Sequence, residues 1–149
     1  MRFVAVLTVA TLMGIPTAFA ANTDKILDTQ EMTALAARAE QATPKDRCYL
    51  YAQLVSAMTA LAGKQMDAGD SSDASASLKA IQEYTAKIHG DVTNDSRKLK
   101  DAQIMMRRTA FRLKELMSGA SLSDQPIFEA TLKQLDQVQS QLMLAVFKK

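Results

Sequence analysis

The residues that could do chemistry are concentrated in one basic stretch of the sequence, between positions 97 and 114. Its cations, which only Asp101 opposes, are Arg97, Lys98, Lys100, Arg107, Arg108, Arg112 and Lys114. If the stretch is helical, most of these cations lie on the side opposite its apolar residues, and Ile104 and Phe111 share that outward side seven residues apart. Such a face can bind an acidic protein, an anionic lipid surface or a polyanion of the cell envelope.

We therefore expect a partner-binding face on this helix. Its candidate residues are Arg97, Lys100, Ile104, Arg107, Arg108, Phe111 and Lys114. The alternative is a solvated face whose cations meet acids of a neighbouring helix or of another chain, because charged runs usually keep a helix soluble. The acids available for this are Asp67, Asp70, Asp73, Glu83, Asp91 and Asp95. In that case Ile104 and Phe111 simply pack against a second helix.

Catalysis by a nucleophile and a base has few residues to use. His89 is the only histidine and Cys48 the only cysteine, and nothing in the sequence places the two together. A histidine followed by Gly90 is more typical of a helix end, where a cation interacts favourably with the helix dipole. We expect no catalytic residue and no enzymatic activity.

Patterns that hold metals and cofactors are also missing from the sequence. One cysteine cannot supply the paired motif that attaches haem, and Ala86 stands where a di-iron helix needs Glu before His89. Zinc, phosphate-loop and nucleophile-elbow patterns do not occur. The methionines after position 20 could bind Cu(I) through sulfur; they are Met32, Met58, Met66, Met105, Met106, Met117 and Met143. Because several lie on apolar stripes and none forms a Met-x-Met cluster, core packing explains them better. We expect no cofactor.

The first twenty residues have the pattern of a secretory signal peptide. Arg2 precedes an apolar run at 3–13, a Gly/Pro break follows, and Ala18-Phe19-Ala20 is a small-x-small cleavage site. The run is shorter than the ~20 residues that span a bilayer, which argues against an uncleaved anchor. We expect a mature chain that begins at Ala21, has no transmembrane segment and is periplasmic or secreted.

Length and charge suggest one small domain with no strong electrostatic preference. The 149-residue chain has a formal charge of +2, which falls to +1 when Arg2, the only charged residue of the signal, is removed. Residues 21–149 suit a single helical domain. This balance exerts no general attraction on nucleic acid, which we do not expect as a partner. Cys48 has no second cysteine to pair with, so it is either buried and inert or a route to a covalent dimer.

Four helices account for the spacing of apolar residues in the mature chain, and no stretch alternates as a strand does. The expected helices span about 24–41, 44–68, 72–117 and 124–147. Thr43 is a suitable N-cap for the second helix, and Pro44 suits its first turn. Because the join between the first two helices is so short, we expect a corner or kink there and not a full reversal.

The third helix carries the main expectation about architecture. Its apolar residues keep one seven-residue repeat: Leu78, Ile81, Ile88, Val92, Leu99, Ala102, Met106, Leu113 and Leu116. His89-Gly90 and residues 93–95 are local signals for a break, whereas the unbroken register favours continuity. We expect one long central helix, with a kink allowed near Gly90, in an elongated all-α bundle of about four helices.

Together these features predict an exported, non-enzymatic interaction or structural protein. It would bind a protein partner or a second copy of itself through the basic and apolar face, and an anionic envelope component is a further possible partner. Two alternatives stay open. One is a chaperone-like protein that holds unfolded clients on adaptable Met-containing surface; the other, less favoured, is a metal or small-ligand binder.

Overall fold

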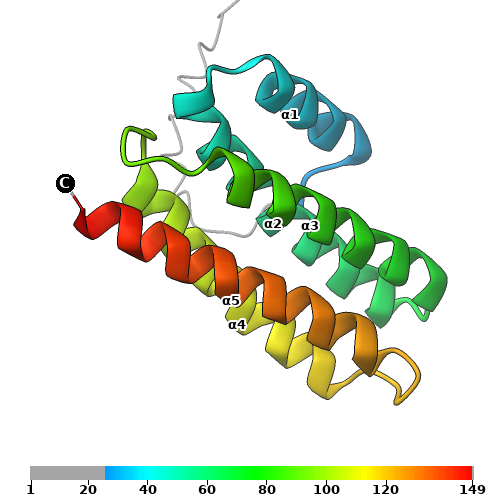
Figure 1. Ribbon diagram of the computed structural model, residues 1–149. Coiled ribbons are helices and arrows are strands. Elements are labelled where there is room, and N and C mark those ends of the chain that lie inside the picture. The colour runs from blue at the N-terminus through cyan, green and yellow to red at the C-terminus, as the bar shows by residue number, and fades with distance from the viewer. Residues whose placement is uncertain (1–25, 149) are drawn as a thin grey trace, which may run out of the picture.

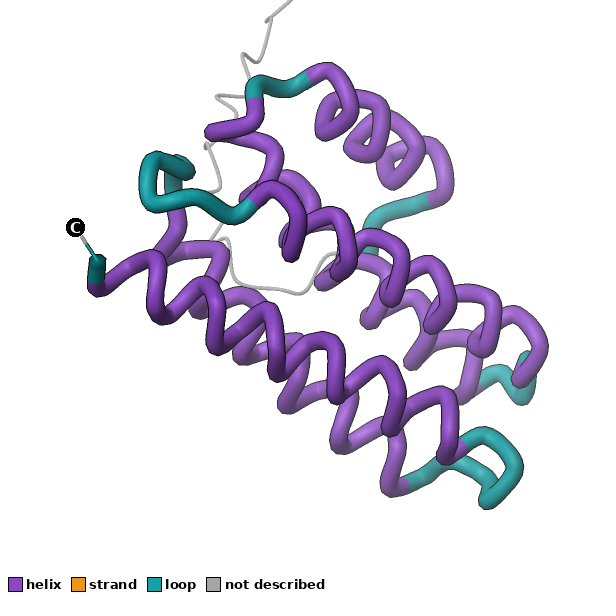
Figure 2. The backbone as a smooth tube through the Cα atoms, viewed as in Figure 1, coloured by secondary structure: helices purple, strands orange, loops and turns teal. Residues whose placement is uncertain are grey.

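The computed structural model describes residues 26–148, and each regular element in that range is an α-helix (Figures 1 and 2). The helices are α1 (Thr29–Gln41), α2 (Pro44–Asp67), α3 (Ser71–Asp91), α4 (Leu99–Ser118) and α5 (Gln125–Phe147). They pack together, which confirms the all-α class. None of these helices is long and apolar enough to cross a membrane. The predicted signal peptide at 1–20 lies outside the described residues.

Helices α2 to α5 form a four-helix bundle. α2 packs against α3 and α4, and α5 packs against the same two helices, so α2 is diagonal to α5 and α3 is diagonal to α4. Successive helices of the bundle run in opposite directions (Figure 1). The bundle therefore consists of two antiparallel hairpins, α2–α3 and α4–α5, and the connection from α3 to α4 crosses a diagonal.

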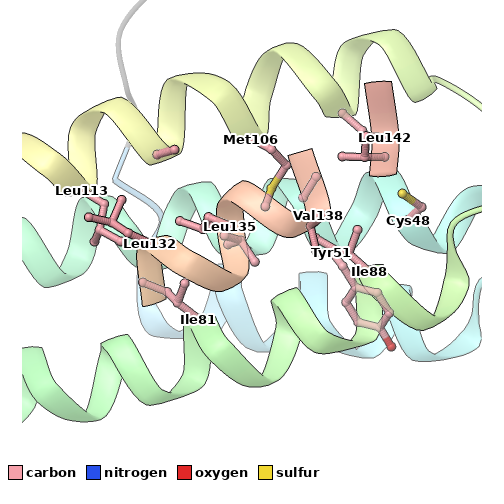
Figure 3. Close-up of a cluster of buried hydrophobic side chains, with 14 of the residues drawn as sticks. Cys48, Tyr51, Ile81, Ile88, Met106, Leu113, Leu132, Leu135, Val138 and Leu142 are labelled. Carbon is pink, nitrogen blue, oxygen red and sulfur yellow. The ribbon is translucent and has the colours of Figure 1, made fainter. Parts of the chain in front are cut away.

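The main core lies between the four helices of the bundle (Figure 3). Its buried side chains recur at steps of three, four and seven residues, so that each helix turns one stripe inward. They include Cys48, Tyr51 and Val55 of α2, Leu78, Ile81 and Ile88 of α3, Met106 and Leu113 of α4, and Phe128, Leu135, Val138 and Leu142 of α5. Removing these stripes from water is the main force that holds the bundle together.

Helix α1 lies over the bundle and forms a second, smaller core with α2. Met32 and Leu35 pack there with Leu54 of α2. The helix begins with a capping box, in which the Asp28 carboxylate accepts a hydrogen bond from the Glu31 N–H at 2.7 Å and the Glu31 carboxylate accepts one from the Asp28 N–H at 3.1 Å. These reciprocal bonds satisfy backbone donors that a helix start otherwise leaves open.

The corner expected between the first two helices is wrong, because the chain folds back and α1 runs against the direction of α2 (Figure 1). Two extended residues make this possible: ψ is 156° at Ala42 and 151° at Thr43. They carry the chain away from the axis of α1 before Pro44 starts the next helix. The side chain of Arg47 donates a hydrogen bond to the Ala42 carbonyl at 3.1 Å and so holds the turn against α2.

The single long helix expected over 72–117 is also wrong. α3 ends at Asp91, α4 begins at Leu99, and the chain reverses between them, so the protein has five helices where about four were expected. The local break signals decide the outcome: Ser96 donates its backbone N–H to the Thr93 carbonyl at 3.1 Å, and its hydroxyl accepts from the Thr93 N–H at 3.1 Å. The reversal lets both apolar halves cover one core, which a straight helix in a single chain cannot do.

Candidate partner-binding surface

Six of the seven predicted partner-binding residues lie on α4, and all six are exposed to solvent. They are Lys100, Ile104, Arg107, Arg108, Phe111 and Lys114. Phe111 is 65% exposed and Ile104 is 38% exposed. The opposite side of α4, which includes Met106 and Leu113, faces the core. The outward face predicted for this helix is therefore accessible in the folded chain.

Arg97 does not belong to this face. It lies in the connection before α4, and its guanidinium forms an ion pair with Asp46 of α2 at 3.2 Å. Its backbone N–H donates a hydrogen bond to the Lys45 carbonyl at 2.7 Å. The next residue, Lys98, places its Nζ 4.6 Å from the centroid of the Tyr49 ring, a distance typical of a cation–π contact. Both cations thus fasten the connection to α2.

The edge of α4 that faces α2 carries balanced charge. Arg108 lines a groove between these two helices together with Asp101 and Glu115 of α4 and Tyr49 of α2. Carboxylates therefore lie beside the cations along this edge. A solvated and internally compensated surface, the alternative to partner binding, describes this part of the predicted face well.

The edge of α4 that faces α5 is balanced only near the end of α4. There Lys114 lines a groove with Glu129, Lys133 and Asp136 of α5. Helix geometry places Lys100 and Arg107 on the same edge, because the three cations recur every seven residues. Residues 140–148, at the end of α5, contain no acid. The beginning of this edge therefore has cations without neighbouring carboxylates from α5.

Large apolar side chains are exposed at this same end of the bundle. Since α4 and α5 are antiparallel, the beginning of α4 lies beside the end of α5 (Figure 1). There Met143 is 46%, Leu144 59% and Phe147 80% exposed. We call the combined surface the α4–α5 patch. It consists of Lys100 and Arg107 of α4 and Met143, Leu144 and Phe147 of α5, whereas Ile104 lines the groove between α2 and α4.

The prediction from sequence missed the α5 half of this patch. The available signal was the run of six apolar residues at 142–147, since a helix with one side on a core cannot bury six consecutive side chains. Leu142 and Ala145 point into the core, and the exposed Met143, Leu144 and Phe147 are left outside it.

Cys48 and His89 occupy different environments. Cys48 is fully buried, and desolvation raises the pKa of its thiol to about 12, with a smaller contribution from the charge of Asp91. Of the two roles considered for this cysteine, the structure supports the buried and inert one. His89 is exposed in the last turn of α3, and its backbone carbonyl accepts a hydrogen bond from the Gln141 side chain at 3.0 Å.

Most of the methionines serve the core, as their spacing predicted. Met32 and Met106 are buried, and Met58 and Met66 pack against core residues. Met143 differs, because it lies in the α4–α5 patch. Within residues 26–148, no three His, Cys, Asp or Glu side chains are grouped so that they could hold a metal ion.

None of the three comparisons with known proteins finds a relative of this chain. No protein-family model matches the sequence, and neither the curated proteins nor the solved structures include a significant match.

Proposed function

We propose that this chain is an exported, non-enzymatic interaction protein that binds an acidic protein partner through the α4–α5 patch. The observation that carries the proposal is the exposure of Met143, Leu144 and Phe147 at the end of the bundle where α4 begins. Lys100 and Arg107 belong to the beginning of α4, and residues 140–148 contain no acid. Clustered apolar side chains on a folded protein typically mark an interaction site, because leaving them in water is unfavourable.

The cations of the patch favour one class of partner. Lys100 and Arg107 would attract carboxylates on an approaching surface, while the apolar residues supply the buried centre of the contact. A symmetric dimer through the patch is less favourable, because each copy would bring the same two cations to the interface and like charges repel. The proposed partner is therefore a different protein with an acidic rim around an apolar contact.

A cross-linking pull-down from the cell-envelope fraction tests the proposal. The tagged wild-type chain is compared with Phe147→Ser and with the double variant Lys100→Glu/Arg107→Glu. Leu122→Ser serves as the matched control, since Leu122 is 84% exposed but lies in the α4–α5 turn, at the other end of the bundle. We expect one protein in fixed ratio with the wild type and with the control, and its loss with both patch variants.

Three outcomes would contradict the proposal. Recovery of the same protein by the patch variants would show that the contact lies elsewhere. Recovery of many unrelated proteins would instead indicate a chaperone-like holder. If no protein is recovered, co-sedimentation with phosphatidylglycerol vesicles that depends on Phe147 would assign the patch to an anionic lipid surface.

A further inference from the structure

The seven-residue register of α3 continues into α4 across a connection that is not helical. Residues spaced by seven form two seams. The first seam consists of Leu78, Thr85, Val92, Leu99, Met106 and Leu113. The second seam consists of Ile81, Ile88, Asp95, Ala102, Thr109 and Leu116. All of these side chains are buried except Val92 and Asp95, which lie in the connection, and the half-buried Leu116. Two helices joined by a turn have no need of a common phase, whereas one continuous helix requires it.

The connection between α3 and α4 is strained where it meets α4. Lys98 has φ 52° and ψ 31°, in the left-handed region, and within residues 26–148 it is the only residue other than glycine with a positive φ. Lysine adopts this conformation at a cost, because its Cβ crowds the backbone. Lys98 is also the N-cap of α4 but makes no side-chain cap hydrogen bond. A helical connection would remove both the strain and the uncapped start.

We propose that the chain has a second state, in which residues 92–98 are helical and α3 and α4 form one helix. Two copies then exchange hairpins, so that the α2–α3 hairpin of one copy packs against the α4–α5 hairpin of the other. The partner in this assembly is a second copy of the chain. Contacts of α2 with α4 and of α3 with α5 are retained between copies, and each bundle keeps its core.

The balance between the two states depends on a few residues of the connection. The ion pair of Arg97 with Asp46 and the contact of Lys98 with Tyr49 hold the connection in the monomer. In the continuous helix Asp95 falls on the apolar seam, where a carboxylate is unfavourable. Both effects favour the monomer, while the strain at Lys98 and the shared register favour the exchanged dimer. The proposal is independent of the α4–α5 patch.

Two substitutions in the connection separate these states. Asp95 is exposed in the monomer, so Asp95→Leu leaves the monomer core unchanged but adds an apolar residue to the seam of the dimer. We expect it to raise the dimer-to-monomer ratio roughly tenfold or more, because one leucine per copy is buried. The Ser96 N–H donates a hydrogen bond to the Thr93 carbonyl and so closes a four-residue turn. Asn94 occupies the first central position of that turn. Proline is favoured at that position but breaks a helix, so Asn94→Pro should remove the dimer.

The double variant Asp95→Leu/Asn94→Pro is the matched control. It keeps the new apolar side chain but cannot form the continuous helix, so we expect a monomer. Each variant is unfolded, refolded at high protein concentration and analysed by size-exclusion chromatography with light scattering. If the double variant dimerises as much as Asp95→Leu, the leucine causes association through an exposed apolar surface without exchange of hairpins. That result would overturn the proposal. The absence of dimer in all chains, Asp95→Leu included, would also overturn it.

A distance measurement within one chain identifies the exchanged form directly. Spin labels are placed at exposed positions 76 in α3 and 114 in α4 through Ala76→Cys and Lys114→Cys, in dimers of Asp95→Leu diluted with unlabelled chain. In the monomer both positions lie at the bundle end far from the connection. In one continuous helix they are about 57 Å apart, at 1.5 Å per residue. A dimer that shows only the short distance would mean association through outer surfaces and would refute the exchange.

Discussion

Glu40, in the last turn of α1, forms an ion pair with Lys87 of α3. The ammonium of Lys87 also lies 5.4 Å from the ring centroid of Tyr51 and 5.3 Å from that of Tyr84. Because α1 packs mainly on α2, this cluster ties its end to a second helix of the bundle. An acid near a helix C-terminus is otherwise unfavourable with the dipole, so the lysine also compensates for the position of Glu40.

This ion pair predicts how pH affects the stability of the fold. The hydrogen bond with Lys87, followed by one with Tyr51, lowers the pKa of Glu40, and the same bond with Glu40 raises the pKa of Lys87. The carboxyl contribution is therefore complete above the unfolded value of about 4.3 and is lost as pH falls through the lower folded pKa. The lysine contribution is complete below about 10.4 and is lost as pH rises through the higher folded pKa.

We expect Glu40→Gln to lower the thermal unfolding midpoint slightly at neutral pH and to have less effect as the medium becomes more acidic than pH 4. Circular dichroism melts at a series of pH values measure this. Glu129→Gln, at an exposed acid of α5 away from Lys87, is the matched control. Equal shifts for both variants at every pH would contradict a specific contribution from the pair.

Cys48 should not react in the folded protein. Its thiol is buried and its pKa is raised to about 12, so hardly any thiolate is present at pH 8, and reagent cannot reach it. We expect no modification by Ellman's reagent in native buffer and complete modification in guanidinium chloride. Rapid modification of the native chain, or a disulfide-linked dimer on a non-reducing gel, would show that the thiol is accessible.

Two neighbouring leucines of α5 should differ sharply in their contribution to stability. Leu142 is fully buried and Leu144 is 59% exposed. We expect Leu142→Ala to reduce the free energy of unfolding by about 2–5 kcal/mol, because it leaves a cavity in the core. Leu144→Ala should change it by less than about 0.5 kcal/mol. Urea denaturation followed by circular dichroism measures both, and similar losses would mean that the patch is a structural element of the fold.

Periodicity predicted the helices well where local and tertiary preferences agree. α2 and α5 differ from their predicted ranges, 44–68 and 124–147, by a single residue at one end. Their apolar stripes identify the buried sides, since any helix in a small domain must cover one such stripe. The described α1 starts at Thr29, later than the expected residue 24, because Asp28 provides the cap.

The same periodicity could not locate the turn between α3 and α4. A seven-residue repeat that keeps its phase through Ile88, Val92 and Leu99 is equally compatible with one helix and with two helices that share a core. The choice depends on whether covering helices come from the same chain, which is a tertiary property. The hydrogen bonds of Ser96 and the ion pair of Arg97 with Asp46 become visible only after folding.

Half of the candidate site followed from helix geometry alone. The spacing of Lys100, Ile104 and Arg107 places them on the outward side of α4 in any packing that buries Met106. That Phe147 and Leu144 lie at the same end of the bundle as Lys100 and Arg107 depends on the antiparallel pairing of α4 with α5, which positions the beginning of α4 beside the end of α5. Asp101 likewise lines a groove with Arg108 only because α2 packs beside α4, which the sequence alone does not show.

The seven-residue connection between the two hairpins also has a kinetic consequence. A short tether gives the α2–α3 hairpin an effective concentration on the order of millimolar with respect to its own α4–α5 hairpin. Chains that fold in dilute solution should therefore close on themselves, while chains that fold near that concentration meet a neighbour equally often. Once formed, either assembly can rearrange only by separating the core around Leu135 and Met106. The concentration at which the chain first folds, rather than the one at which it is kept, then determines which assembly a preparation contains.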